Sequence, residues 1–80
     1  MKAEISIYLK ASILDPQGQA IASSLKALGH NHISDIRVGR LIHLEMESED
    51  QQKNIAQIHQ MCQQLLVNEV MESYSLRIIQ

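Results

Sequence analysis

The chain has 80 residues, a formal net charge of −2 and a single cysteine. At this length we expect one domain over residues 1–80, with a thin core that gains from a partner surface. One cysteine excludes an internal disulfide, and the charge balance gives no electrostatic footprint for nucleic acid. No apolar run approaches the length of a membrane span, about 18 residues, and no apolar signal segment opens the chain, so a cytoplasmic location is expected.

The first strand and the first helix are indicated by their apolar period and by capping residues. Apolar residues alternate from Ile5 to Leu9, which is the period of a half-buried strand. Asp15 is a good N-cap, Pro16 suits the first helical position, and Gly29 suits the left-handed residue past a helix end. These signals predict a helix over Asp15 to Gly29. The apolar stripe of this helix, expected to face the core, consists of Ile21, Leu25 and Leu28.

A strand pair is expected around Gly39-Arg40. The apolar residues that show the strand period on its two sides are Ile36, Val38, Ile42, Leu44 and Met46. A two-residue turn at Gly39-Arg40 would divide this apolar set between the two faces of the sheet. Pairing Val38 with Ile42 keeps the set on one face, and it requires a three-residue connection or a bulge in which Gly39 takes a positive φ. We favour the bulge.

The remaining elements are a second helix and a final strand. Ser48-Glu49-Asp50-Gln51 has the spacing of a capping box. The face of the helix that follows is lined by Ile55, Ile58, Cys62, Leu65 and Leu66, and the last strand carries Tyr74, Leu76 and Ile78. The order β-α-β-β-α-β predicts an α+β, ferredoxin-like fold, in which two helices cover one face of a four-stranded antiparallel sheet.

The second face of such a sheet is left open. By alternation, this open face would carry Tyr8, Lys10, Arg37, Leu41, His43, Glu45, Arg77 and Ile79. This mixture is too apolar for a plain solvent face and too charged for a core. We therefore interpret the open face as a candidate subunit contact.

The side chains that could serve in catalysis or metal binding can also be explained by ordinary structural roles. Cys62 lies on the apolar stripe of its helix, where packing in the core is a commoner role than nucleophilic catalysis. His59 with Cys62, and His30 with His32, are spaced to touch one ion, yet neither pair has a clear third ligand. A boundary position for His59 and a solvated turn for His30-Asn31-His32 are the simpler interpretations. We assign no catalytic, cofactor-binding or metal-binding residue.

Two surface features also favour the simpler explanation. An acidic cluster could attract a cation, but it also fits a solvated strand end followed by the start of a helix; its members are Glu45, Glu47, Glu49 and Asp50. RNA binding on a sheet of this kind needs several aromatic platforms and a basic surround, and Tyr8 alone is insufficient.

Three segments together carry a resemblance to a known family. They are Asp15-Pro16-Gln17-Gly18, Arg37-Val38-Gly39-Arg40 and the helix end from Met61 to Asn68. With them the sequence resembles PurS, the small subunit of phosphoribosylformylglycinamidine synthase, over essentially all of its 80 residues. Two positions depart from the family pattern: Arg40 stands where a lysine is typical, and Glu69 stands where a proline often follows Asn68.

The resemblance implies a subunit without an active site of its own, within an ATP-dependent, glutamine-hydrolysing ligase of purine biosynthesis. Its implied partners are a glutaminase subunit (PurQ) and a synthetase subunit (PurL), between which it supports ammonia transfer, with ATP and Mg used by the synthetase. It also implies a homodimer or higher oligomer. The residues implied as assembly elements are Asp15, Pro16, Gln17, Gly18, Arg37, Val38, Gly39, Arg40 and Asn68.

A regulatory ligand-binding module of the ACT kind is the alternative function. It shares the order of elements and also has a turn with Asp, Pro and Gly between its first strand and helix, so the fold alone does not separate the two. An ACT module usually sits on the enzyme that it regulates, whereas we expect residues 1–80 to form a single domain. The hairpin at Arg37 to Arg40 and the helix end at Met61 to Asn68 favour PurS.

Overall fold

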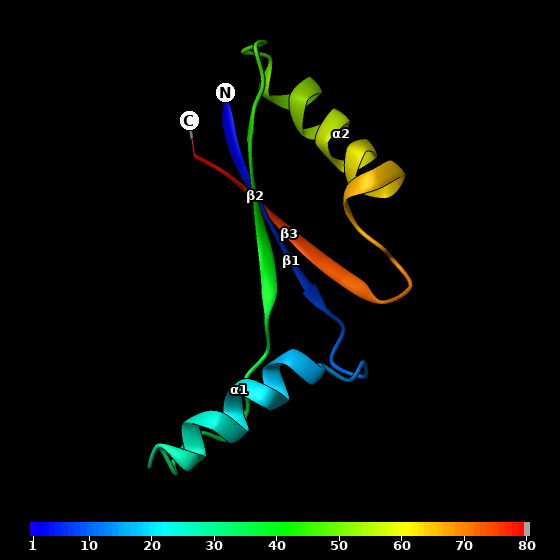
Figure 1. The fold of residues 1–80 in the computed structure, drawn as a ribbon. Helices are drawn as coiled ribbons and strands as arrows, with labels where there is room; N and C mark the ends of the chain where they lie inside the picture. The colour runs from blue at the N-terminus through cyan, green and yellow to red at the C-terminus, as the bar shows by residue number, and fades with distance from the viewer. Residues whose placement is uncertain (80) are drawn as a thin grey trace.

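The computed structural model describes residues 1–79. Its elements in chain order are β1 (Lys2–Leu9), α1 (Pro16–Ala27), β2 (Gly39–Glu45), α2 (Gln51–Met61), a π-helical turn η1 (Cys62–Leu66) and β3 (Glu72–Ile78). Figure 1 shows a narrow sheet with α2 beside it and α1 projecting from its lower end. The α+β class is therefore confirmed.

The sheet is antiparallel, with β1 between β2 and β3. Ile5 is paired with Ile42 on one side and with Leu76 on the other, so apolar residues of all three strands share one face. Ile58 and Cys62 pack onto that face and are fully buried. The core is small, and its buried members are Ala3, Ile5, Ile7, Ile58, Cys62 and Val67.

The expected hairpin around Gly39-Arg40 is wrong. Gly39 is the first residue of β2 and is paired with Tyr8 of β1, and it does not have a positive φ. The sheet formed by residues 1–79 accordingly has three strands, because residues 31–38 form no strand within it. They run back alongside α1 and enter β2 without a turn (Figure 1).

Residues 10–38, which leave the sheet after β1 and return at β2, form a projection that we call the arm. The molecule measures 49 × 26 × 14 Å and has a radius of gyration of 16.2 Å, against about 12 Å for a compact chain of this length. The expectation that the apolar stripe of α1 faces the core of its own chain is wrong, since Ile21 is 38% and Leu28 is 75% exposed. The caps of the helix are as expected: Asp15 is the N-cap, and Gly29 has a φ of 102°.

The end of the second helix differs from an α-helix. The backbone N–H of Val67 donates to the carbonyl of Cys62 at 3.0 Å, which closes the wider π turn. Leu65, expected on the buried face, is 84% exposed as a result. At the other end the N-cap is Asp50, whose Oδ1 accepts the N–H of Lys53, and Ser48 does not cap the helix as the capping box requires.

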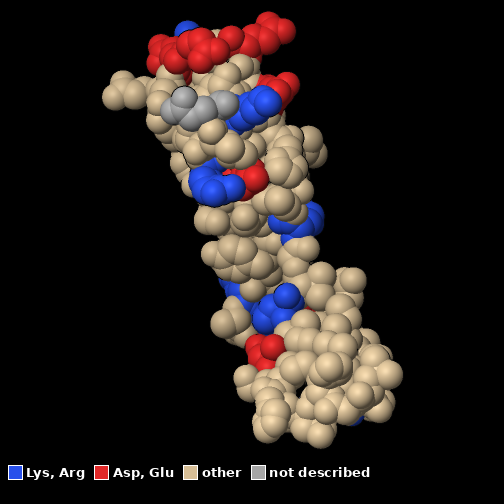
Figure 2. All heavy atoms as spheres, turned by 90° about the vertical axis from the view of Figure 1, so that its left-hand side faces the viewer, with Lys and Arg blue, Asp and Glu red and all other residues tan. Residues whose placement is uncertain are grey.

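The open face of the sheet carries most of the residues expected there. Tyr8, Leu41, His43, Glu45 and Arg77 lie in mutual register on that face, together with Ile79. Figure 2 views this side and shows acidic side chains gathered at the end near the start of α2. Lys10 and Arg37 were wrongly placed in this set, because both lie in the arm.

Candidate assembly site

Two predicted segments meet where the arm joins the sheet, and Asp15 holds them together. Its side chain is 4% exposed. Oδ1 accepts the backbone N–H of Gly18 at 2.9 Å, and Oδ2 accepts the backbone N–H of Val38 at 2.7 Å. Hydrogen bonds to a carboxylate favour its charged form. The bond from Gly18, and after it the bond from Val38, therefore hold the pKa of Asp15 below its ordinary value of 3.8. Asp15 therefore caps α1 and fixes the return segment at once.

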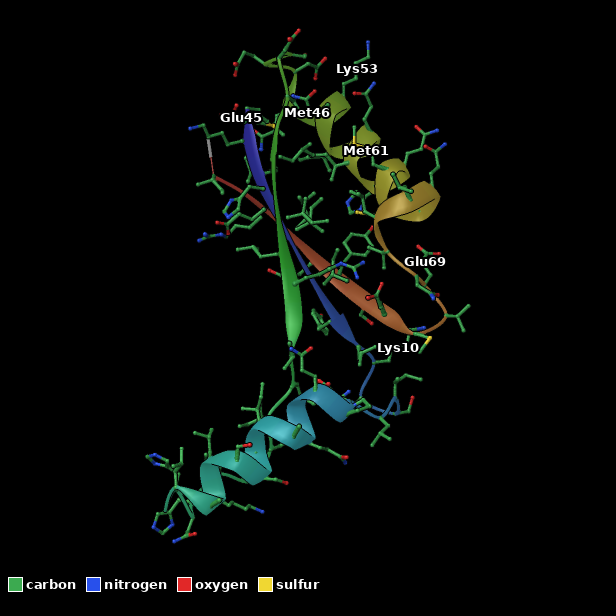
Figure 3. The ribbon with its side chains drawn as sticks, in the orientation of Figure 1. Lys10, Glu45, Met46, Lys53, Met61 and Glu69 are labelled. Atoms are coloured by element: carbon green, nitrogen blue, oxygen red, sulfur yellow. The ribbon has the colours of Figure 1, made fainter. Side chains whose placement is uncertain are left out.

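A second link between the same segments comes from Arg37. Its Nη2 donates to the carbonyl oxygens of Lys10 and Ile13, at 3.0 and 2.8 Å. Lys10 lies just beyond the end of β1, at the foot of the sheet (Figure 3). Arg37 thus ties the outgoing leg of the arm to the returning leg.

Two glycines allow the backbones to approach at this joint. A Cβ at Gly18 would lie 2.1 Å from the carbonyl oxygen of Ile36, and a Cβ at Gly39 would lie 2.5 Å from that of Ile7. Pro16 occupies the first helical position of α1, as predicted. The seven predicted residues from Asp15 to Gly18 and from Arg37 to Gly39 therefore belong to one structure, which we call the arm joint.

Arg40 and Asn68 belong to a second cluster, organised by Glu72. Both guanidinium Nη atoms of Arg40 lie 3.1 Å from the Glu72 carboxylate, and Nη2 also donates to the carbonyl of Leu66 at 2.6 Å. The backbone N–H of Asn68 donates to the same carboxylate at 2.8 Å. The side chain of Asn68 accepts the N–H of Val70 at 3.2 Å and so shapes the turn into β3. The cluster joins β2, the end of η1 and β3.

Sequence reasoning missed Glu72, although a signal was present. Glu72 is separated from Tyr74, Leu76 and Ile78 by even numbers of residues. Residues with this spacing share one face of a strand, so Glu72 lies on the apolar face of the last strand. A carboxylate on such a face needs a cationic partner. Its side chain is 15% exposed, and Arg40 supplies that partner.

Surface hollows lie on both sides of this second cluster. One has a volume of about 200 Å³ and is reached by Gln17, and the other has a volume of about 340 Å³ and is lined by Asn68. Both have Leu9, Arg40 and Glu72 in their walls. The nine residues predicted as assembly elements therefore lie around the lower half of the sheet, where the arm begins.

The chemically reactive side chains lie apart from this region. Cys62 is fully buried, and burial is the main cause that raises the pKa of its thiol. Nδ1 of His59 lies 2.6 Å from the hydroxyl of Tyr74, which links α2 to β3. His30 and His32 are exposed at the far end of the arm. Within residues 1–79 no three His, Cys, Asp or Glu side chains are placed to hold a metal ion, and no helix is long and apolar enough to span a membrane.

A sheet covered on one face, with an arm fixed outward by its own hydrogen bonds, defines a small α+β protein whose arm leaves apolar side chains uncovered. The family model of PurS, described as phosphoribosylformylglycinamidine (FGAM) synthase, matches residues 2–80. The chain belongs to the PurS family and is a subunit of phosphoribosylformylglycinamidine synthase. This membership favours the predicted function over the ACT-like alternative.

Individual relatives resemble the chain over most of their length. The PurS subunit of Mycobacterium leprae is 41% identical over 75 residues, which cover 94% of this chain and 91% of the relative. The PurS subunit of Synechocystis is 40% identical over 74 residues, which cover 92% of this chain and 74% of the relative.

Solved structures of the family share the fold. Bacillus subtilis PurS superimposes with a TM-score of 0.85 at 33% identity, covering 99% of this chain and 98% of the other. A chain in the structure of PurLQS from Thermotoga maritima gives a TM-score of 0.90 at 32% identity, covering 98% of this chain and 95% of that chain.

Proposed function

We propose that this chain is the assembly subunit of the synthase, without an active site of its own, and that it holds a glutaminase subunit (PurQ) against a synthetase subunit (PurL). The observation that carries the proposal is the match to a chain of PurLQS from Thermotoga maritima over 98% of the present chain. The name PurLQS combines the letters of the three subunits PurL, PurQ and PurS.

The shape of the chain supports this role. The arm exposes Leu14, Ile21 and Leu28, and Lys26 is the one formally charged side chain in α1. A helix with so little charge and an uncovered apolar stripe is suited to burial against another chain. The arm joint acts indirectly in this role, because its residues bond to one another and thereby set the direction of the arm.

Ammonia transfer is the purpose of the assembly in this proposal. Ammonia released at the glutaminase is productive only if it reaches the synthetase before it escapes to water. A subunit that fixes the two active sites relative to each other therefore acts through orientation. ATP and Mg²⁺ are used by the synthetase partner, and we place the whole complex in the cytoplasm.

The active form of the subunit is a homodimer or a higher oligomer in this proposal. The core of one chain is thin, and both the arm and the outer edge of β2 lack a partner within residues 1–79. A second copy completes the ferredoxin-like arrangement, with four strands in each sheet and two helices on one face.

Reconstitution tests the assembly role. Purified glutaminase and synthetase are mixed with and without this chain, and product formation is followed with glutamine or with ammonium salt as the nitrogen donor. We expect the chain to be required with glutamine and dispensable with ammonium. Equal rates from glutamine without the chain would refute the assembly role.

A further inference from the structure

The turn between η1 and β3 presents two apolar side chains to solvent. Val70 is 81% exposed and Met71 is 42% exposed, and both lie in the turn formed by residues 69–71. The hollow beside them has Met71 and the exposed Leu65 in its wall. A single exposed apolar residue is common on a protein surface, whereas neighbouring ones mark a contact site more often. We call Val70 and Met71 the apolar tip.

Hydrogen bonds hold the apolar tip in one shape. The carbonyl of Asn68 accepts the backbone N–H groups of Met71 and Glu72, at 3.0 and 2.7 Å. Its side-chain oxygen accepts the N–H of Val70 at 3.2 Å, and its own N–H donates to the Glu72 carboxylate at 2.8 Å. A group that is already ordered loses less conformational entropy when it is bound. The apolar tip is therefore preorganised for contact with another molecule.

Unpaired charges flank the apolar tip. The backbone N–H of Lys10 donates to the carbonyl of Met71 at 2.9 Å, so Lys10 lies next to the tip, and Glu69 precedes it in the chain. Figure 3 shows the labelled side chains of Glu69 and Lys10 above and below this turn. Both are exposed, and neither forms an ion pair within residues 1–79. The tip thus offers one free cation and one free anion to a binding partner.

We propose that the apolar tip docks into an apolar recess on a different chain of the synthase, with an acidic group of that chain beside Lys10 and a basic group beside Glu69. The inference rests on the proposed function and adds a place at which a partner subunit binds. It also gives Asn68 a role in assembly, because Asn68 shapes the turn that carries the tip.

The charges of this chain argue against a second copy as the occupant. A recess that receives the tip must offer a free base to Glu69. In the hollows beside the tip, Arg40 already pairs with Glu72 at 3.1 Å. In the hollows at the other end of the sheet, Lys2 pairs with Glu45 at 3.5 Å. A second copy therefore lacks a free base in these hollows.

A titration of the reconstituted synthase tests the docking site. Purified glutaminase and synthetase are held at fixed concentration, this chain is added in increasing amounts, and product formation from glutamine gives its half-maximal concentration. The test variant is Val70→Glu. The matched control is Gln60→Glu, which adds the same charge at an exposed position of α2. Thermal unfolding and light scattering check the fold and the oligomeric mass of each variant.

We expect Val70→Glu to raise the half-maximal concentration about tenfold or more, because a charge would enter an apolar recess at a site where single residues can dominate binding. Gln60→Glu should leave it unchanged. Lys10→Glu and Glu69→Lys keep every backbone hydrogen bond of the turn and serve as second variants. Each should raise the half-maximal concentration by a smaller factor, and the increase should shrink at high salt.

Three outcomes would overturn the docking site. Equal half-maximal concentrations for Val70→Glu and the wild type would overturn it and leave the assembly role standing. A smaller oligomeric mass for a folded Val70→Glu variant would show that the tip meets a second copy. Product formation from glutamine at the full rate without this chain would refute the assembly role, and the docking site with it.

Discussion

The carboxylate of Asp15 accepts the backbone N–H of Val38 at 2.7 Å, across 23 positions of sequence. This bond joins the residue that caps α1 to the residue that precedes β2. The two legs of the arm are therefore held together in part by one nearly buried carboxylate.

The first prediction concerns pH. The hydrogen bonds lower the pKa of Asp15 in the folded chain below its ordinary value of 3.8. A group whose folded pKa is depressed stabilises the fold above its unfolded pKa, and this contribution is lost as the pH falls through the folded pKa. Thermal unfolding of the wild type should therefore show a loss of stability that begins near 3.8 and continues below it.

Asp15→Asn should lower the melting temperature at neutral pH and reduce this acid dependence. Asparagine offers one side-chain oxygen, so it retains one acceptor and lacks the charge. Asp35→Asn, an exposed acid in the same arm, is the control. An unchanged acid profile in Asp15→Asn would show that the carboxylate does not hold the joint.

The second prediction concerns Gly18. Alanine is favoured over glycine inside a helix by about 1 kcal/mol. Its Cβ, however, would lie 2.1 Å from the carbonyl oxygen of Ile36, which is backbone and cannot rotate away. Overpacking of this kind costs about 1–3 kcal/mol, so we expect Gly18→Ala to destabilise the chain in urea unfolding. Gln19→Ala, at an exposed position of the same helix, should be neutral or slightly stabilising.

The third prediction concerns Arg40. Lysine keeps the charge but cannot donate in parallel to Glu72 and to the carbonyl of Leu66. Because Arg40 is 53% exposed, we expect Arg40→Lys to cost about 1 kcal/mol or less of global stability. The local effect should be larger, with faster hydrogen exchange at the amides of Met71 and Glu72. Arg77→Lys, on the open face of the sheet, should leave those amides unchanged.

The fourth prediction concerns the apolar stripe of the arm. Leu28 is 75% exposed in the single chain, so Leu28→Glu should not disturb the fold of one copy. It should weaken self-association and reduce product formation from glutamine in the reconstituted complex. Ser23→Glu, which adds the same charge elsewhere on α1, is the control. Light scattering that shows equal association for the wild type and Leu28→Glu would place the interface elsewhere.

Local patterns predicted most elements but not their arrangement. The period of Ile5 to Leu9 and the caps at Asp15 and Gly29 are determined by neighbouring residues, and the structure confirms them. Gly39 was correctly singled out for the wrong reason: it permits the approach of the Ile7 carbonyl and has no positive φ. A Cβ at Gly39 would lie 2.5 Å from that carbonyl oxygen, so we expect Gly39→Val to destabilise the chain.

The direction of the arm could not be obtained in the same way. A helix stripe such as Ile21, Leu25 and Leu28 shows that something must cover it, but not whether the cover belongs to the same chain. The sequence predicts which residues belong to the candidate site, but it does not predict how these residues are arranged in space. Asp15 and Arg37 form hydrogen bonds across the two legs of the arm. Such bonds depend on contacts between distant parts of the chain.

The π turn at Cys62–Leu66 has the geometry of an α-helix into which one residue has been inserted. The insertion advances the helical phase by about 100°, which is why Cys62 points into the core while Leu65 points to solvent. Deletion of Gln63 should remove the phase step and turn Leu65 inward, closing the hollow beside Asn68. A helical wheel drawn through this segment is thus valid only as far as Cys62, and the positions after it, up to Leu66, must be shifted by one when burial is inferred.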